Sequence, residues 1–297
     1  MAGYRILKDS IAKHTMLILT IICILILFSI GLGLLVKSLP ILKEKSLMEL
    51  LTTSNWRPSK GEFGFLAYIL STLYVTGIAI FLALPVSLMS AIYISEYASK
   101  TIRRFFNPVI DLLSGIPPVI YGVWGTLTIV PLISEVLAPH FVDFSTGYSV
   151  LAAGVVLAVM ITPLIVSILL EVFDAVPKEM REASLSIGAT KWQTIKKVVL
   201  KKAFPGIVAA IVLAISRAFG ETIAVLMVAG NYTEIPKSVF DACYPLPALI
   251  ANNYGEMMSM PEYESALMLA AFLLFLIIVI FNALSRWILA EIDKRYH

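Results

Sequence analysis

Two opposite charges lie within an otherwise apolar stretch of the sequence, residues 203–229. Arg217 and Glu221 are four residues apart, and on a continuous helix this spacing puts both side chains on one face, where they can touch. A charged side chain at the centre of a membrane costs at least about 2.5 to 3.5 kcal/mol on insertion scales. A pair that is so unfavourable to bury indicates a functional site more often than a structural one.

The residue types favour recognition of an oxyanion. The guanidinium of Arg217 presents a planar fork of donors that matches two oxygens of a tetrahedral anion, and it keeps its charge at physiological pH. We predict that Glu221 is an internal counter-ion, which neutralises Arg217 when the site is empty and competes with a bound anion. Gly220 leaves room for a backbone or a substrate, and Thr222 adds a hydroxyl donor. The alternative is a structural ion pair that locks this helix to a neighbour.

The composition predicts a membrane around these charges. The chain has 297 residues, of which 59% are hydrophobic and 14% charged, with a mean hydropathy of +0.89. Soluble globular domains carry about 25% charged residues, so an ordinary soluble enzyme, a disordered chain and a collagen-like repeat are excluded. The net charge of +3 is too small to indicate nucleic acid as a partner. We predict an all-α polytopic membrane protein whose outer surface contacts membrane lipid.

Six stretches are long enough to cross a bilayer, which takes about 20 apolar residues. They are residues 15–36, 66–95, 112–134, 144–170, 203–229 and 265–285. Lysine and arginine concentrate in the segments that a cytoplasmic N-terminus puts inside, which predicts that both termini are cytoplasmic. The exception is the first outer segment, residues 37–65, which is also basic. We expect a single transmembrane domain over residues 1–297, with an uncleaved first span rather than a signal peptide.

A second unusual segment lies in the third predicted span. Residues 114–125, SGIPPVIYGVWG, hold two adjacent prolines among three glycines. Proline in a spanning helix frees backbone carbonyls, which need a neighbour or a hydrated cavity. We predict a broken helix that lines a pathway, with Pro117, Pro118 and Tyr121 as lining residues. Simple helix kinks for packing are the alternative.

Residues 171–204 form the one large element that is predicted on the inner side. Pro177 suits the first turn of a helix, Gly188 suits its C-terminal cap, and Thr190 with Gln193 forms a capping-box pattern that starts a second short helix. Two interpretations stay open. The element is either an amphipathic segment that lies on anionic headgroups or a docking element for a cytoplasmic partner.

This element resembles the EAA signature of the inner-membrane subunits of ABC importers, which reads EAA, three residues, G, nine residues, I, one residue, LP. The matching residues are Glu182, Ala183, Ser184, Gly188, Val198 and Leu200. Ser184 replaces the second alanine, and Lys201 stands where proline is usual, although Pro205 and Gly206 supply a break four residues later.

In that family the loop forms a coupling helix that fits a cleft on an ATPase subunit. The resemblance therefore assigns coupling to residues 171–204, and within them to Arg181, Glu182, Ala183, Ser184, Gly188 and Ala189.

Three strings narrow the resemblance to the phosphate-specific importers, over about residues 60–290. They are AIYISEYAS at 91–99, SGIPPVIYGVWG at 114–125 and SRAFGETIAVLMVAGN at 216–231, and the last is more similar to the PstC-type than to the PstA-type permease subunit. The resemblance implies a type I ABC importer permease with a core over residues 66–289, in a bacterial or archaeal plasma membrane. It also implies a PstA-like second permease subunit, a cytoplasmic ABC ATPase dimer that holds ATP and Mg²⁺, and an extracytoplasmic phosphate-binding protein.

Missing motifs limit the chemistry of the chain itself. The sequence has no Gly-x-x-x-x-Gly-Lys-Ser/Thr phosphate loop, and its histidines and cysteines have no metal-ligand spacing. We expect a transport subunit that is not an enzyme and that holds no cofactor or metal of its own. The rivals are a permease for another oxyanion such as sulfate or molybdate, and a secondary transporter that works without ATP. Repeated broken half-helices, which are typical of secondary transporters, are not visible in the two halves of the sequence.

Overall fold

The structure is a computed structural model that describes residues 2–255 and 260–296. Within these residues, six helical segments are long and apolar enough to cross a membrane. They are Ser10–Glu44, Leu66–Tyr97, Pro118–His140, Val150–Asp174, Lys191–Phe219 and Pro261–Trp287. The predicted all-α architecture with six spans is confirmed.

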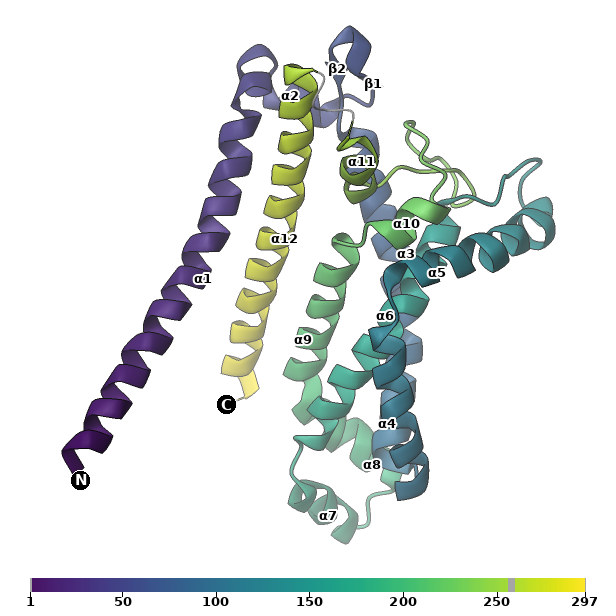
Figure 1. Cartoon of the computed structure of the whole chain (residues 1–297). Coiled ribbons are helices and arrows are strands. Elements are labelled where there is room, and N and C mark those ends of the chain that lie inside the picture. Colours follow the sequence, from purple (N-terminus) through teal and green to yellow (C-terminus); the bar gives the residue numbers. More distant parts are fainter. Residues whose placement is uncertain (1, 256–259, 297) are drawn as a thin grey trace.

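The elements follow one another as a helical bundle with one small hairpin (Figure 1). The first half consists of α1 Ala2–Glu44, α2 Leu47–Thr52, β1 Trp56–Arg57, the 3₁₀ turn η1 Pro58–Lys60, β2 Glu62–Phe63, α3 Leu66–Ile92, the π-helical turn η2 Tyr93–Tyr97, α4 Lys100–Gly115, α5 Pro118–Trp124, the π-helical turns η3 Gly125–Ile129 and η4 Leu132–Leu137, and the 3₁₀ turn η5 Ala138–His140. The second half consists of α6 Val150–Asp174, α7 Lys178–Ser186, α8 Lys191–Thr194, the π-helical turn η6 Ile195–Val199, α9 Leu200–Phe219, α10 Ile223–Val228, α11 Leu246–Asn253 and α12 Pro261–Tyr296.

The main hydrophobic core forms around α6. Its side chains Val156, Leu157 and Ile161 are fully buried, and α3, α4, α9 and α10 pack against this helix. Small residues let spanning helices approach closely. Gly154 is the small residue that allows α6 to approach α3. A Cβ at Gly154 would lie 2.5 Å from Cγ2 of Ile78, so the contact requires glycine.

A second core lies at the opposite end of the bundle from α7 and α8. The ring of Trp56 is surrounded there by Phe63, Tyr68 and Tyr263, which joins the hairpin β1–β2 to α3 and α12. Nearby, the Nζ atoms of two cations from the basic outer segment have partners: Lys37 pairs with Glu264 at 2.7 Å, and Lys45 donates to the carbonyl of Gly61. These contacts supply a local reason for the excess of positive charge in residues 37–65.

Both ends of the chain lie toward the same end of the bundle as α7 and α8, in the lower part of Figure 1. The hairpin and α2 lie at the other end. This arrangement agrees with the prediction that both termini share one side of the membrane with the long inner loop. Helix α1 packs on α12 beside the rest of the bundle, and most of its apolar surface is open.

Two predicted spans have different limits in the structure. The third span begins at Pro118 rather than at residue 112, because α4 ends at Gly115 and the two prolines exclude a helical backbone at Ile116 and Pro117, whose ψ angles are 129° and 138°. The fifth span, predicted over residues 203–229, ends at Phe219. Beyond the break at residues 220–222, α10 is a separate short helix.

The inner end of the fifth span also differs. The predicted second short helix of the inner loop is continuous with the span, because α8, η6 and α9 run without interruption from Lys191 to Phe219. With Lys201 in place of proline nothing stops the helix there, and it also passes through Pro205. Gly206 is a packing site rather than a break, since a Cβ on it would lie 2.5 Å from Cγ1 of Val172 in α6.

The remaining limits move by a few residues. The fourth span begins at Val150 instead of residue 144, after Ser149, whose side chain caps α6 by accepting from the backbone N–H of Ala152 at 3.1 Å. The α-helix α6 then continues to Asp174, beyond the predicted end at residue 170. The first helix extends past both predicted limits of its span.

The close contact of α3 with α6 predicts that substitution by alanine lowers the unfolding temperature at one glycine but not at another. Gly154→Ala overpacks this interface, and such changes cost about 1–3 kcal/mol, so the thermal unfolding temperature of the detergent-purified protein should fall by several degrees. Gly77→Ala on α3 is the matched control, because a Cβ at Gly77 meets nothing within 4 Å. Equal unfolding temperatures for the two variants would contradict the described packing of α3 on α6.

Candidate functional site

The predicted charge pair lies where α9 ends. Arg217 is in the last turn of α9, and Gly220 closes that helix with a hydrogen bond from its N–H to the carbonyl of Arg217 at 3.2 Å. Glu221 lies within the break at residues 220–222, so the two residues do not share one continuous helix. Among the described residues, no ion pair joins them. The predicted contact between the two side chains is therefore absent from this structure.

Glu221 and Thr222 instead shape the start of α10. Oε1 of Glu221 accepts a hydrogen bond from the backbone N–H of Ala224 at 3.3 Å, and Oγ1 of Thr222 donates to the carbonyl of Gly220 at 3.2 Å. Both side chains are half-buried. The carboxylate is thus held at the break, one turn along the chain from the cation that it was predicted to neutralise.

Arg217 is exposed and unpaired within the part of the chain that the structure describes. It follows Ala203 by 14 residues of the same helix, a rise of about 21 Å at 1.5 Å per residue, which is well inside a hydrocarbon layer of about 30 Å. The preceding residue, Ser216, donates to Oδ1 of Asn282 in α12 at 3.3 Å.

This geometry does not support the alternative of an ion pair within the chain that locks α9 to a neighbouring helix. A guanidinium at this depth needs a polar partner. No described residue supplies that partner; water, an anion or another subunit can supply it.

The broken third span packs directly against this region. Helix α5 contacts α10 through Gly122, where a Cβ would lie 3.2 Å from Cα of Ala224. Oγ1 of Thr126 donates to the carbonyl of Met227 at 3.2 Å, which adds a polar link between the two segments. The structure thus places the break that was predicted in the third span next to the break at residues 220–222, which the sequence analysis did not predict.

The three predicted lining residues differ in their surroundings. Pro117 is exposed and Pro118 is half-buried at the turn between α4 and α5. Tyr121 is buried, and its hydroxyl donates to the carbonyl of Leu113 at 2.8 Å, so the ring bridges the break. The break itself is confirmed, whereas the part of these residues in a pathway stays a prediction.

The inner loop has the predicted caps. Pro177 directly precedes α7, and Gly188 follows it with a φ of +86°, a left-handed conformation that favours glycine. Thr190 and Gln193 form both hydrogen bonds of a capping box at the start of α8, with distances of 3.3 and 2.9 Å. The order of helix, glycine turn and helix is confirmed. Oγ of Ser184 lies 2.9 Å from Oγ1 of Thr194 and ties α7 to the continuous helix.

The predicted coupling residues fall into two groups. Glu182, Ala183 and Gly188 are exposed, and next to them Ile187 has 84% of its surface open. Met180, Leu185 and Trp192 are further large hydrophobic side chains of α7 and α8 that the chain leaves exposed. Exposed apolar groups that gather at one place indicate an interaction surface.

The second group is less exposed to solvent than the first and consists of Arg181, Ser184 and Ala189. All three are half-buried, and Arg181 pairs with Glu96 at the inner end of α3, with 2.8 Å between Nη2 and Oε1. The sequence analysis did not identify Glu96, although it is the single acidic residue in the string AIYISEYAS.

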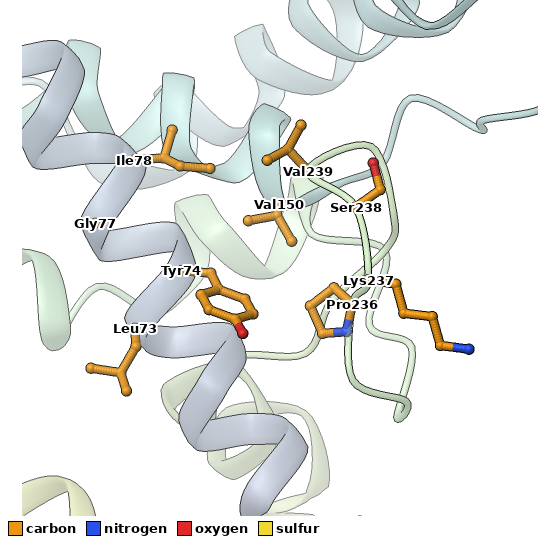
Figure 2. A pocket seen from close by; sticks show the side chains of 9 residues that line it. All are labelled: Leu73, Tyr74, Gly77, Ile78, Val150, Pro236, Lys237, Ser238 and Val239. Atoms are coloured by element: carbon orange, nitrogen blue, oxygen red, sulfur yellow. The ribbon is translucent and has the colours of Figure 1, made fainter. Parts of the chain in front are cut away.

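A pocket of about 410 Å³ lies at the outer end of the bundle (Figure 2). Side chains of α3, among them Tyr74 and Ile78, face the loop over residues 236–239, and the side chain of Lys237 points away from Tyr74. Arg217 does not line this pocket. Most residues that line this pocket are apolar, and its one cation is the outward-pointing Lys237, so the candidate site stays at the break between α9 and α10.

Comparison with known proteins shows which family this chain matches. Residues 83–297 match the family described as "Binding-protein-dependent transport system inner membrane component". The chain is 41% identical to the probable ABC transporter permease protein YqgH of Bacillus subtilis over 210 residues, which cover 70% of this chain and 66% of that protein. It is 32% identical to the phosphate transport system permease protein PstC of Haemophilus influenzae over 300 residues, with 96% of this chain and 94% of that protein covered.

A solved structure shows the same fold. The crystal structure of a bacterial ABC transporter involved in the import of the acidic polysaccharide alginate superposes with a TM-score of 0.62. The match covers 97% of this chain and 99% of that chain, at 17% identity. At this identity the likeness concerns the fold alone.

Because Arg217 is exposed, we predict that a cysteine placed at this position reacts with a water-soluble, thiol-specific reagent. Arg217→Cys, in a Cys23→Ser background, should be modified by a cationic methanethiosulfonate in the assembled complex. Ala214→Cys, three residues earlier and fully buried, is the matched control and should not react. Burial raises the pKa of the Cys243 thiol to about 12, so this native cysteine stays protonated and silent. Failure of the cysteine at position 217 to react would contradict an aqueous environment.

Proposed function

The chain belongs to the family of binding-protein-dependent transport system inner membrane components, and on this premise we propose that it is a permease subunit of an ATP-driven phosphate importer. The family and the six apolar helices make it a multi-pass inner-membrane protein. The names of several relatives that cover most of the chain, all phosphate transport permeases, support the choice of substrate.

One observation carries the proposal: Arg217 is an exposed cation on a spanning helix, and no described residue pairs with it. Its planar fork of donors fits two oxygens of phosphate. In the proposed cycle, an extracytoplasmic binding protein delivers phosphate from outside. The pore that this chain forms with a PstA-like second permease subunit then alternates its access, and phosphate passes Arg217 on its way inward.

Glu221 has the part of a counter-ion in this proposal. A guanidinium without a nearby negative charge would hold a phosphate anion too tightly for release in a low-dielectric tunnel. The carboxylate of Glu221 is fixed at the helix break by the N–H of Ala224. From there it lowers the local positive potential without closing a direct ion pair, so that the fork of Arg217 stays available to the substrate.

In this proposal, the exposed surface of the inner loop couples ATP hydrolysis on the ATPase subunits to transport through the permease. The chain has no phosphate loop of its own, so we place ATP and Mg²⁺ on a dimer of cytoplasmic ABC ATPase subunits. The exposed apolar surface around Ile187, together with Glu182 and Ala183, is the part that enters a cleft on an ATPase subunit. The permease chain then contributes a pathway and a docking element rather than a catalytic site.

The proposal is tested by purification and reconstitution. The tagged chain should co-purify with a P-loop ATPase, and proteoliposomes that contain the complex should take up labelled phosphate when ATP and the binding protein are present. Sulfate and molybdate, added in excess, should not compete. Efficient competition would assign the permease to another oxyanion, and uptake by the chain alone without nucleotide would assign it to the secondary transporters.

Substitutions at the break should separate binding from release. Arg217→Gln should reduce phosphate uptake by about 10- to 100-fold, since hydrogen bonds to a charged group contribute about 1.5–3 kcal/mol. Arg217→Lys keeps the charge without the fork and should recover only part of the uptake. Glu221→Gln should leave assembly intact and change turnover or the retention of phosphate. Unchanged uptake kinetics in Glu221→Gln would remove its counter-ion role.

A further inference from the structure

The inner end of α3 carries an ion pair that the proposed transport mechanism does not use. The side chains of Glu96 and Arg181 are only 10% and 18% exposed. Nε and Nη2 of Arg181 both donate to Oε1 of Glu96, at 3.1 and 2.8 Å. The same guanidinium also donates to the carbonyls of Val176 and Phe173, at 2.5 and 2.8 Å. One side chain thus joins α7, the end of α6 and the end of α3.

A second contact joins α8 to Tyr97, which follows Glu96 in the π-helical turn η2. Nζ of Lys191, the first residue of α8, lies 4.7 Å from the centre of the Tyr97 ring, a cation–π distance. Because the Ser184–Thr194 contact ties α7 to α8, the two coupling helices form one unit. This unit contacts η2 at two adjacent residues, Glu96 and Tyr97.

The turn η2, which contains both Glu96 and Tyr97, is π-helical, as are η3, η4 and η6. Turns of this kind in α-helices are frequent at functional sites. It ends α3, and after Ala98 the side chain of Ser99 caps α4 by accepting from the N–H of Ile102 at 3.3 Å. A displacement of η2 therefore moves the inner ends of both α3 and α4.

Burial separates this contact from an ordinary surface pair. Removal of one member of a shielded ion pair leaves the other charge without a partner and away from water, so the two members resist separation. The neighbouring pair of Arg103 and Asp174, which joins α4 to the end of α6, is 34% and 44% exposed. Pairs that are as exposed as this contribute little.

From these contacts we infer that Glu96 is a positioning residue for coupling, which transmits movement of the α7–α8 unit to the second span through η2. The inference rests on the proposed function, because it assumes that α7 receives the closure of an ATPase. It adds a specific route: the force enters at the exposed surface around Ile187, passes through Arg181 and Glu96, and leaves along α3.

The first experiment measures phosphate uptake and ATP hydrolysis in the same proteoliposomes. Glu96→Gln should assemble and hydrolyse ATP in response to the binding protein, but phosphate moved per ATP should fall at least about 5-fold, the lower end of typical coupling effects. Arg181→Gln should have a similar effect, and the double variant should be no worse than either single variant. Arg103→Gln is the control and should retain the ratio of the unmodified complex.

A ratio in Glu96→Gln equal to that of the unmodified complex would overturn the inference. Loss of uptake and hydrolysis in equal proportion would also overturn it, because that result indicates a merely structural role. Failure of the unmodified complex to take up phosphate would instead overturn the proposed function.

A second measurement keeps both Glu96 and Arg181 in place. Spin labels on cysteines introduced at the exposed positions Lys178, on α7 of the coupling unit, and Met89, on α3, in a Cys23→Ser background, report whether the two elements move together. The distance between the labels should change by less than about 2 Å between ATP-bound and nucleotide-free complexes, the scale of small helix shifts. A larger change in that distance would show that α3 does not follow the coupling unit.

Discussion

An arginine held deep in an apolar span, without a partner among the residues that the structure describes, is the constraint on which the account depends. Such a charge is too unfavourable in lipid to be left there without compensation. The described residues give Arg217 neither an ion pair nor a hydrogen bond, and its side chain is open. Compensation must therefore come from what surrounds the chain in the membrane. In the proposed function, a hydrated pathway between permease subunits supplies it, and an anion that enters this pathway meets a fork of donors that is not already occupied.

The fold places this cation by means of helix ends and close glycine contacts. Helix α9 ends at Phe219, α10 begins at Ile223, and α5 packs against α10 through Gly122. At the inner side, the helical run from Lys191 to Phe219 is unbroken. The same helix thus begins in the coupling element and carries Arg217 in its last turn. A displacement of α8 can reach the cation along one rigid element, while Arg181 and Glu96 connect α7 to a second span.

Much of this arrangement follows from local patterns in the sequence. Long apolar stretches predict the six spans, and Pro177, Gly188, Thr190 and Gln193 predict the helix ends of the inner loop, because caps depend on a few neighbouring residues. The termination of α9 at Gly220 was not predicted, since apolar residues continue on both sides of it and hydropathy does not distinguish one helix from two. The pairing of Arg181 with Glu96 joins residues that are 85 positions apart in the sequence. Contacts of this kind are set by the packing of α3 against α6, which no local pattern contains.

The central claim concerns the surroundings of one guanidinium in the assembled transporter. A structure of the complete complex, trapped with phosphate inside the membrane and determined at a resolution that shows ordered water, measures the distance from Arg217 to the anion directly. We expect a phosphate oxygen within about 3 Å of the guanidinium, in a hydrated cavity between the two permease subunits. Arg217 enclosed among packed side chains, with no cavity that reaches it in the inward-open, outward-open or occluded state, would contradict the account.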